Sequence, residues 1–375
     1  ASIMECFSSQ TVPCISTLAT SFAVCDRWHA SVPGPTQPNR MFVFSATSDG
    51  AANNNDVHIA AGYSQKTVFD NLFEAGHSIG VYYSDFPGAL IMRHLREPKY
   101  WPYIKQIHQF YNDCKSGVLP NFSFLEPRWF SVSDWGASDE HPPHDVALGE
   151  YIIANVYEAL RSSPLWEKTL LIVTFDEHGG FYDHVPTPIL NVPNPDGKVS
   201  RDPPFAFERI GIRVPTILVS PWITAGTVIN EPNAEQSSGQ EGCRWEHSSI
   251  SSSLKHLFNL PDFLTKRDAW AAHFDSSIVM ESKPRTDCPL ELPVPGSPSQ
   301  KAKRKIEITT PLTDELLRQC EEKGDISNDP LSDLQYEILT IAKGLTNSDF
   351  DVYSLKTEHQ GAVYVREQLH AFFNK

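Results

Sequence analysis

Short apolar segments, separated by one long amphipathic stretch, limit the folds open to this chain. The segments are HSIGVYY (77–83), FSFLE (122–126), TLLIVTF (169–175) and VPTILVS (214–220), each bounded by glycine, proline or charge as buried strands are. Between the second and the third, residues 146–162 carry apolar side chains at helical intervals. Strands that alternate with a helix are typical of a mainly parallel sheet. We therefore predict an α/β fold.

An acidic pair stands where the third segment ends. Asp176 and Glu177 follow TLLIVTF directly, and ligands of such sheets bind beyond the carboxyl ends of the strands. The two carboxylates suit a divalent cation, general acid–base catalysis or the capping of a turn. Both reach one ion only if the chain turns after them, which Gly179 and Gly180 would permit.

The stretch SVPGPTQPNR (31–40) holds a candidate nucleophile. Thr36, two residues before a proline, predicts a helix start, although the apolar run at 41–44 also suits a strand. At a helix start the backbone N–H groups and the dipole favour an anion, so the Thr36 hydroxyl would be placed to attack phosphorus. The alternative is a threonine that only caps the helix.

Histidines flank several of the predicted elements, and the chain has 14 of them. His141 and His144 precede the predicted helix in HPPHD, and His247 follows the fourth strand segment in WEHSS. Each could transfer protons near neutral pH, or be an ordinary surface or core residue.

Composition limits the partners and the compartment. A net charge of −15, from 46 acids and 31 bases, argues against a nucleic-acid-binding face. Seven dispersed cysteines without CxxC spacing indicate reduced thiols in a core. No apolar run approaches the roughly 18 residues of a membrane span, and no signal-peptide pattern is visible. We expect a protein at the cytosolic face of a membrane or associated with the plasma membrane.

The amino-acid composition of the chain changes near residue 285. Residues 282–298 are rich in proline, the basic run KAKRK follows at 301–305, and helical patterns occur at 331–341 and 364–373. We predict a catalytic domain over 1–285, a linker over 286–300 and a helical C-terminal region over 301–375. The basic run suits either an anionic membrane surface or a solvated linker. Because the sequence begins with Ala1, we expect the first domain to be N-terminally incomplete.

Four motifs together carry a family resemblance: CDRWHASVPGPTQPNR, DEHGGFYDHVPTP, VPTILVSPWITAGTV and WEHSSISSSLKHLFNLPDFLTKRDAWA. They resemble the non-specific phospholipases C of plants, within the phosphoesterase family that also includes bacterial phospholipases C and an acid phosphatase. The resemblance covers residues 25–274, and YEALRSSPLW and VPNPDG are more similar to the plant enzymes. It implies an alkaline-phosphatase-like three-layer α/β/α sandwich with a smaller helical C-terminal region.

The resemblance also implies roles for the residues already singled out. Thr36 would be the nucleophile, with Asn39 and Arg40 supporting the turn of the substrate site. Asp176 and Glu177 match the family's metal-binding acids, and the Thr36 oxygen would complete part of that sphere. The identity of the divalent metal ion stays open, with Ca²⁺ among the candidates.

Histidines in the motifs receive supporting roles. His247 matches a histidine near the phosphoryl group or the leaving oxygen, and His141 is a similar catalytic candidate with which His144 competes. His178 and His184, in the motif of the acidic pair, would support the bound substrate.

The implied reaction is hydrolysis of the glycerol-side phosphodiester of phospholipids, which releases diacylglycerol and a phosphorylated head group at a peripheral membrane surface. Relatives carry a Glu-Asn-Arg motif that completes the metal site, and ENR does not occur in these residues; Asp49 also stands where a histidine is expected. Two alternatives therefore remain: a phosphomonoesterase such as an acid phosphatase, or a lipid-binding pseudoenzyme.

Overall fold

The computed structural model describes residues 2–133, 135–201, 203–274, 276–296, 310–324 and 326–374. The helices are α1 (Pro13–Ser21), α2 (Thr36–Ser45), α3 (Asp56–Ala61), α4 (Val68–Glu74), α5 (Ile107–Ser116), α6 (Val146–Arg161), α7 (Ser248–Leu257), α8 (Lys266–Trp270), α10 (Asp314–Lys323), α11 (Asp333–Thr346) and α12 (Glu358–Phe373). The strands are β1 (Ala23–Cys25), β2 (Trp28–His29), β3 (Ile79–Tyr83), β4 (Ile104–Gln106), β5 (Phe122–Glu126), β6 (Leu171–Thr174), β7 (Ser200–Arg201), β8 (Pro204–Phe205), β9 (Thr216–Val219), β10 (Thr227–Ile229) and β11 (Trp245–Glu246). Each predicted strand segment and the predicted helix at 146–162 therefore has its counterpart: β3, β5, β6, β9 and α6.

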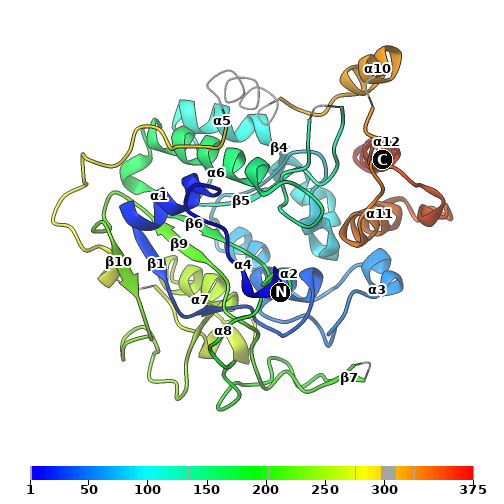
Figure 1. Ribbon diagram of the computed structural model, residues 1–375. Coiled ribbons are helices and arrows are strands. Elements are labelled where there is room, and N and C mark those ends of the chain that lie inside the picture. The colour runs from blue at the N-terminus through cyan, green and yellow to red at the C-terminus, as the bar shows by residue number, and fades with distance from the viewer. Residues whose placement is uncertain are drawn as a thin grey trace.

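Alternate residues along the strands face two separate apolar clusters. Val81 of β3 and Leu218 of β9 belong to one cluster, whereas their neighbours Tyr82 and Val219 belong to the other. Helices α2, α4 and α7 contribute to the first cluster, and α1, α5 and α6 to the second. Figure 1 shows these two groups of helices on opposite sides of the strands. The three layers confirm the predicted α/β class.

The sheets are more mixed than predicted. Strands β4, β3 and β5 form a parallel sheet, but a second sheet of order β10-β1-β9-β6 pairs β9 antiparallel with both β1 and β6. Between β6 and β9 the structure has only the short hairpin β7–β8 and loops within its described residues, so no helix carries the chain back to start a parallel strand. The expectation of a mainly parallel sheet is wrong for this pair.

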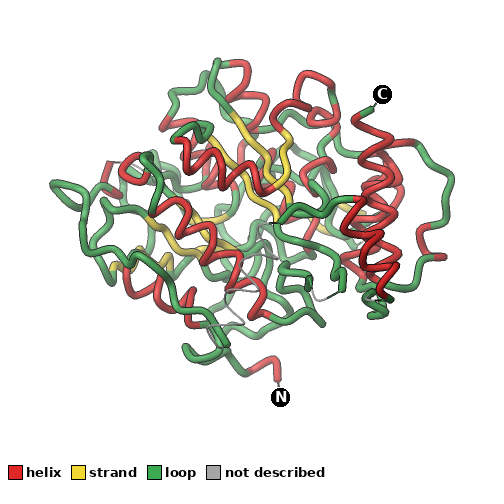
Figure 2. Tube along the Cα trace, turned by 90° about the horizontal axis from the view of Figure 1, so that it is seen from above, coloured by secondary structure: helices red, strands yellow, loops and turns green. Residues whose placement is uncertain are grey.

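The C-terminal helices share the core of the preceding residues. Ile338 of α11 and Val365 of α12 lie in the same apolar cluster as β3 and α2. Helix α11 also approaches α3 so closely that a Cβ at Gly344 would lie 1.9 Å from the Ala60 carbonyl oxygen. Figure 2 shows the paired C-terminal helices at one end of the molecule.

The predicted linker is described as far as Gly296. Within it, Cys288 and Leu292 are buried, and the Pro289 carbonyl accepts a 2.7 Å hydrogen bond from the Tyr157 hydroxyl of α6. Residues 286–296 therefore pack along α6. The basic run 301–305 lies outside the described residues.

Two expectations from composition are met. All seven cysteines are free thiols, and all except Cys6 are buried, which confirms the predicted reduced core thiols. Across the described residues, the structure has no helix with both the length and the apolar character needed to span a membrane.

Candidate functional site

Helix α2 begins at Thr36, one position earlier than it would if Thr36 were the N-cap residue. Pro35 is the N-cap residue, and no side chain caps the helix, so the Thr36 hydroxyl does not serve as a cap. The side chain is 7% exposed at the helix start, where the first backbone N–H groups have no partner within the helix. The Thr36 hydroxyl thus does not cap α2, and it lies at a helix start, the kind of position that favours anions.

Asn39 holds the loop that delivers Thr36. Its fully buried amide accepts a 3.1 Å hydrogen bond from the Val32 N–H and donates to the carbonyls of Val32, Gly34 and Pro35 at 3.0–3.2 Å. One side chain thus bonds an N–H and three carbonyls of the loop before α2. These bonds give Asn39 a structural role in that loop, and its role in the substrate site stays a prediction.

Arg40 ties the same helix to the carboxyl end of β5. Its guanidinium lies 3.0 Å from the Glu126 carboxylate, which also accepts hydrogen bonds from the Gly88 and Ala89 N–H groups at 2.8 Å. Residues four apart share one face of a helix, so Arg40 and Thr36 face the same way. The pair with Glu126 therefore turns that face of α2 toward the carboxyl ends of β3 and β5.

Two short parallel strands bring the α2 loop and His247 to one edge. β2 pairs with β11, Trp28 opposite Trp245, so the loop after β2 and the helix after β11 leave from the same end. Just beyond the strands, the Ser31 hydroxyl donates to the Glu246 carboxylate. This contact joins the loop before α2 to the last residue of β11, although 215 positions separate the two residues in the sequence.

His247 fastens the acidic turn to this edge. Its Nε2 lies 2.7 Å from the Asp176 carbonyl oxygen, and its Nδ1 accepts a 3.3 Å hydrogen bond from Trp28 Nε1–H. The ring is fully buried, and burial lowers its pKa, which keeps it neutral. His247 therefore bonds the backbone of the acidic turn, and both of its ring nitrogens bind protein. This geometry suits a positioning role, and the predicted place of His247 near the phosphoryl group stays a prediction.

The acidic pair forms a tight turn after β6. The Asp176 carboxylate accepts the Glu177 N–H at 3.0 Å, and the Glu177 carboxylate accepts the Gly179 N–H at 2.9 Å. Gly179 adopts a φ of 63°, which permits the reversal predicted from the two glycines. Burial and the neighbouring Asp176 raise the pKa of Glu177, while His178 and His141 lower it.

The two histidines of HPPHD have different surroundings. Buried His144 lies 2.5 Å from Asp139 and 3.5 Å from Glu358 of α12, whereas His141 is partly exposed and acts electrostatically on Glu177. The His141 Nδ1–H donates a 2.7 Å hydrogen bond to the carbonyl oxygen of the next residue, Pro142. His141 is therefore the one of the two near the acidic turn.

The other predicted substrate-site histidines lie along the same loop. His178 Nδ1–H donates a 2.8 Å hydrogen bond to the Phe181 carbonyl oxygen, so it closes the acidic turn. The His184 side chain is 82% exposed beside Asp183. Asp183 itself receives two hydrogen bonds from Arg213, which lower its pKa to about 2. Neither histidine reaches Thr36 through a contact that the structure records.

The residues fit part of a cation site. Asp176 and Glu177 are hard oxygen donors that repel one another, an arrangement that a divalent cation relieves. Over the described ranges, no group of three or more His, Cys, Asp or Glu side chains could hold a metal ion. The acidic pair would thus supply two carboxylates to a coordination sphere that needs further oxygens.

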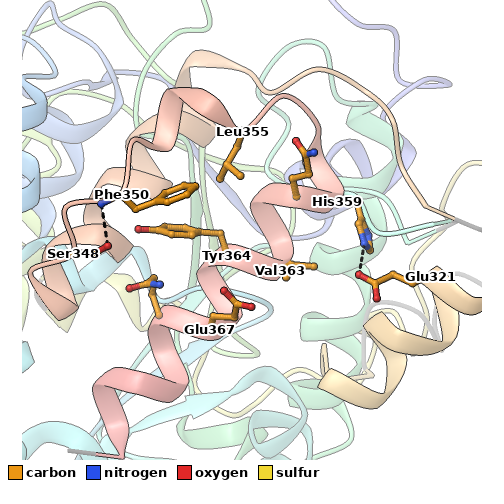
Figure 3. Close-up of a pocket in the computed structure, with 10 residues that line it drawn as sticks. Glu321, Ser348, Phe350, Leu355, His359, Val363, Tyr364 and Glu367 are labelled. Carbon is orange, nitrogen blue, oxygen red and sulfur yellow. Dashed lines mark hydrogen bonds and ion pairs between the residues drawn. The ribbon is translucent and has the colours of Figure 1, made fainter.

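One pocket lies on the C-terminal helices, away from the candidate site residues. It has a volume of ≈ 430 Å³ and lies on the C-terminal helices, where the Phe350 and Tyr364 rings stack 5.0 Å apart and His359 lies 3.1 Å from Glu321 (Figure 3). None of the candidate residues lines it.

Two buried residues of the site were not predicted. Glu246 joins Ser31 to the start of α7, where it also accepts the Ser248 N–H at 3.0 Å. Arg267 is fully buried and donates to the carbonyls of Ser31, Pro193 and Phe207. Both belong to the motif that begins at WEHSS, but neither differs locally from a surface charge in the sequence.

Residues 1–261 match the model of the phosphoesterase family. Non-specific phospholipase C4 of Arabidopsis thaliana is 47% identical over 333 residues, which cover 88% of this chain and 61% of that protein. Non-specific phospholipase C3 of the same plant is 43% identical over 358 residues, covering 94% of this chain and 64% of that protein.

The chain spans less than two thirds of the length of these curated relatives. A solved structure from Vibrio parahaemolyticus, described as a protein of the alkaline phosphatase superfamily, aligns with a TM-score of 0.40 and 11% identity over 84% of this chain and 83% of that chain. The resemblance to plant non-specific phospholipases C is confirmed. Because its matched residues exceed half of its length, the chain belongs to the phosphoesterase family.

Proposed function

We propose that the protein is a phospholipase of the C type, which hydrolyses the glycerol-side phosphodiester of phospholipids. The observation that carries the proposal is the shared edge at which β2 and β11 deliver the start of α2 and His247, with His247 bonded to the acidic turn. A hydroxyl at a helix start and a pair of neighbouring carboxylates are groups that suit the transfer of a phosphoryl group. The names of the Arabidopsis relatives support the lipid substrate.

In this proposal Thr36 is the nucleophile. Its oxygen forms a bond to phosphorus while the bond from phosphorus to the glycerol oxygen breaks, and the diacylglycerol oxygen takes up a proton. Water then hydrolyses the phosphothreonine and releases the phosphorylated head group. The free N–H groups at the start of α2 would stabilise the charge on the phosphoryl oxygens.

Because both ring nitrogens of buried His247 are bonded to protein, we assign the proton-donor role to His141. Its Nδ1 is bonded to the Pro142 carbonyl, so protonation of Nε2 provides a donor on a partly exposed ring. Its electrostatic effect on Glu177 indicates that it lies near the acidic turn. His178 would hold that turn closed.

Asp176 and Glu177 would hold the divalent cation. Such an ion would lower the pKa of a bound hydroxyl and neutralise charge on a phosphoryl oxygen. We expect Asp176→Asn to raise the concentration of added Ca²⁺, Mn²⁺ or Mg²⁺ that half-maximal activity requires by about tenfold or more, because one ligand charge is lost. Metal titrations of both proteins measure this shift, with exposed Asp262→Asn as the control; equal titration curves would contradict the assignment.

The substrate class is tested with two phosphate esters. We expect the protein to release phosphocholine and diacylglycerol from phosphatidylcholine, and to hydrolyse p-nitrophenyl phosphate much more slowly. A reversed preference would favour the phosphomonoesterase. Vesicle binding without any turnover, over a range of divalent cations, would favour the lipid-binding pseudoenzyme.

A further inference from the structure

Five large apolar side chains stand exposed next to the acidic turn. They form what we call the apolar rim: Ile3, Met4, Phe7, Phe181 and Tyr182, which are 55%, 64%, 50%, 40% and 59% exposed. Single exposed apolar residues are ordinary on protein surfaces, but a contiguous group commonly marks an interaction site.

Direct contacts join the two halves of the rim. The Tyr182 N–H donates a 2.9 Å hydrogen bond to the Ile3 carbonyl, and the Phe7 and Phe181 rings meet edge to face with their centroids 6.2 Å apart. Segments far apart in the sequence therefore build this surface together. It is not a chance alignment of isolated side chains.

The rim is continuous with the acidic turn. The Phe181 N–H donates to the His178 carbonyl at 3.1 Å, and the Phe181 carbonyl lies 2.8 Å from His178 Nδ1. His178 directly follows Glu177. Whatever the rim binds is thus brought beside the two carboxylates.

We propose that the apolar rim inserts into the interface of a zwitterionic phospholipid bilayer and so presents the head-group phosphodiester to the acidic turn. This inference rests on the proposed function, because the bilayer is the source of its substrate. Groups that dock in this way enter by about 5–10 Å, to the boundary of head groups and acyl chains. Phenylalanine and tyrosine rings suit that depth, since they combine a large apolar surface with tolerance of a polar neighbourhood.

The charges near the rim favour a zwitterionic surface over an anionic one. Residues 2–12 and 176–190 contain no lysine or arginine, whereas Glu5, Asp176 and Glu177 lie among them. The nearby cation Arg213 is paired with Asp183, so it adds no net positive charge. Binding would therefore depend on apolar burial, which salt screens little, and not on attraction to anionic lipids.

Vesicle sedimentation tests the surface. We expect the wild type to bind phosphatidylcholine vesicles at low and high salt alike, and the double variant Phe181→Ser/Tyr182→Ser to bind roughly tenfold less or weaker still. Phe7→Ser, on the other half of the rim, should weaken binding in the same direction. Leu290→Ser is the matched control, because Leu290 is 72% exposed and lies in the segment that packs along α6.

Turnover of monomeric and of vesicle substrates distinguishes an effect on bilayer docking from an effect on catalysis. We expect the double variant to hydrolyse short-chain phosphatidylcholine, below its micelle concentration, at the wild-type rate, while its hydrolysis of vesicles falls with binding. Wild-type vesicle binding that the rim variants leave unchanged would overturn the proposal. So would the absence of vesicle binding together with self-association that the variants abolish, because the rim would then join two copies of the chain. Binding through the rim with no release of head group would support this surface and refute the proposed function.

Discussion

Thr36→Ala is expected to lower the turnover of phosphatidylcholine by at least about a thousandfold, or about 4 kcal/mol in activation free energy. The hydroxyl is the proposed attacking atom, and water in its place would lack the position that the helix start gives to Thr36. Thr36→Ser keeps the oxygen and should retain measurable turnover. Because Asn39 and not Thr36 holds the preceding loop, the fold should survive either change.

The measurement is head-group release under saturating substrate, with the urea unfolding midpoint as the check on the fold. Thr20→Ala is the matched control, since Thr20 lies exposed on α1 and bonds only to backbone carbonyls of its own helix among the contacts recorded. Acid quenching during turnover should also trap a phosphorylated peptide that contains residue 36. Turnover of Thr36→Ala close to the wild-type value would rule out the covalent route.

His144→Gln is expected to lower the free energy of unfolding by about 3–5 kcal/mol at pH 6, because it leaves two buried carboxylates without their cation. The His144 ring lies between Asp139, at 2.5 Å, and Glu358, at 3.5 Å. Burial alone would lower the pKa of His144. The hydrogen bonds to these carboxylates outweigh burial and raise this pKa to about 10. The network also joins α12 to the loop that carries His141.

The pH dependence follows from the direction of that shift. A histidine whose pKa is raised in the folded state contributes its full stability below about pH 6.5, and the contribution is lost as the pH rises toward 10. Urea unfolding of the wild type and of His144→Gln should therefore give a difference that narrows between pH 6 and pH 10. A difference that stays constant over this range would show that the ring is neutral in the fold. Adding Asp139→Asn to His144→Gln should recover part of the loss.

The sequence predicted elements better than their pairing. Short runs rich in β-branched or aromatic residues identified β3, β5, β6 and β9, because such side chains fit a pleated, buried surface. The antiparallel pairing of β6 with β9 was missed, although residues 176–213 show no helical periodicity that could carry a parallel crossover. A connection without a helix indicates antiparallel pairing, whereas the strand sequences alone do not.

A site residue could be predicted from the sequence where the residues that fix its position lie in the same motif. Thr36 was placed at a helix start within one position, since proline and threonine mark that start locally. The burial of His247 was not, because its partner Trp28 lies 219 residues away in the sequence. For the same reason nothing in HPPHD showed that His144 pairs with Glu358 while His141 stays near the acidic turn.

The first turn of α2 also reaches the C-terminal helices. Gln37, next to Thr36, donates a 3.0 Å hydrogen bond to Glu337 of α11. An isoform or an engineered truncation that ended before α10 would remove this anchor and uncover the apolar faces against which α11 and α12 pack. Residues 314–375, about one sixth of the chain, are therefore coupled to the start of α2, and their loss would remove the Gln37 contact beside Thr36.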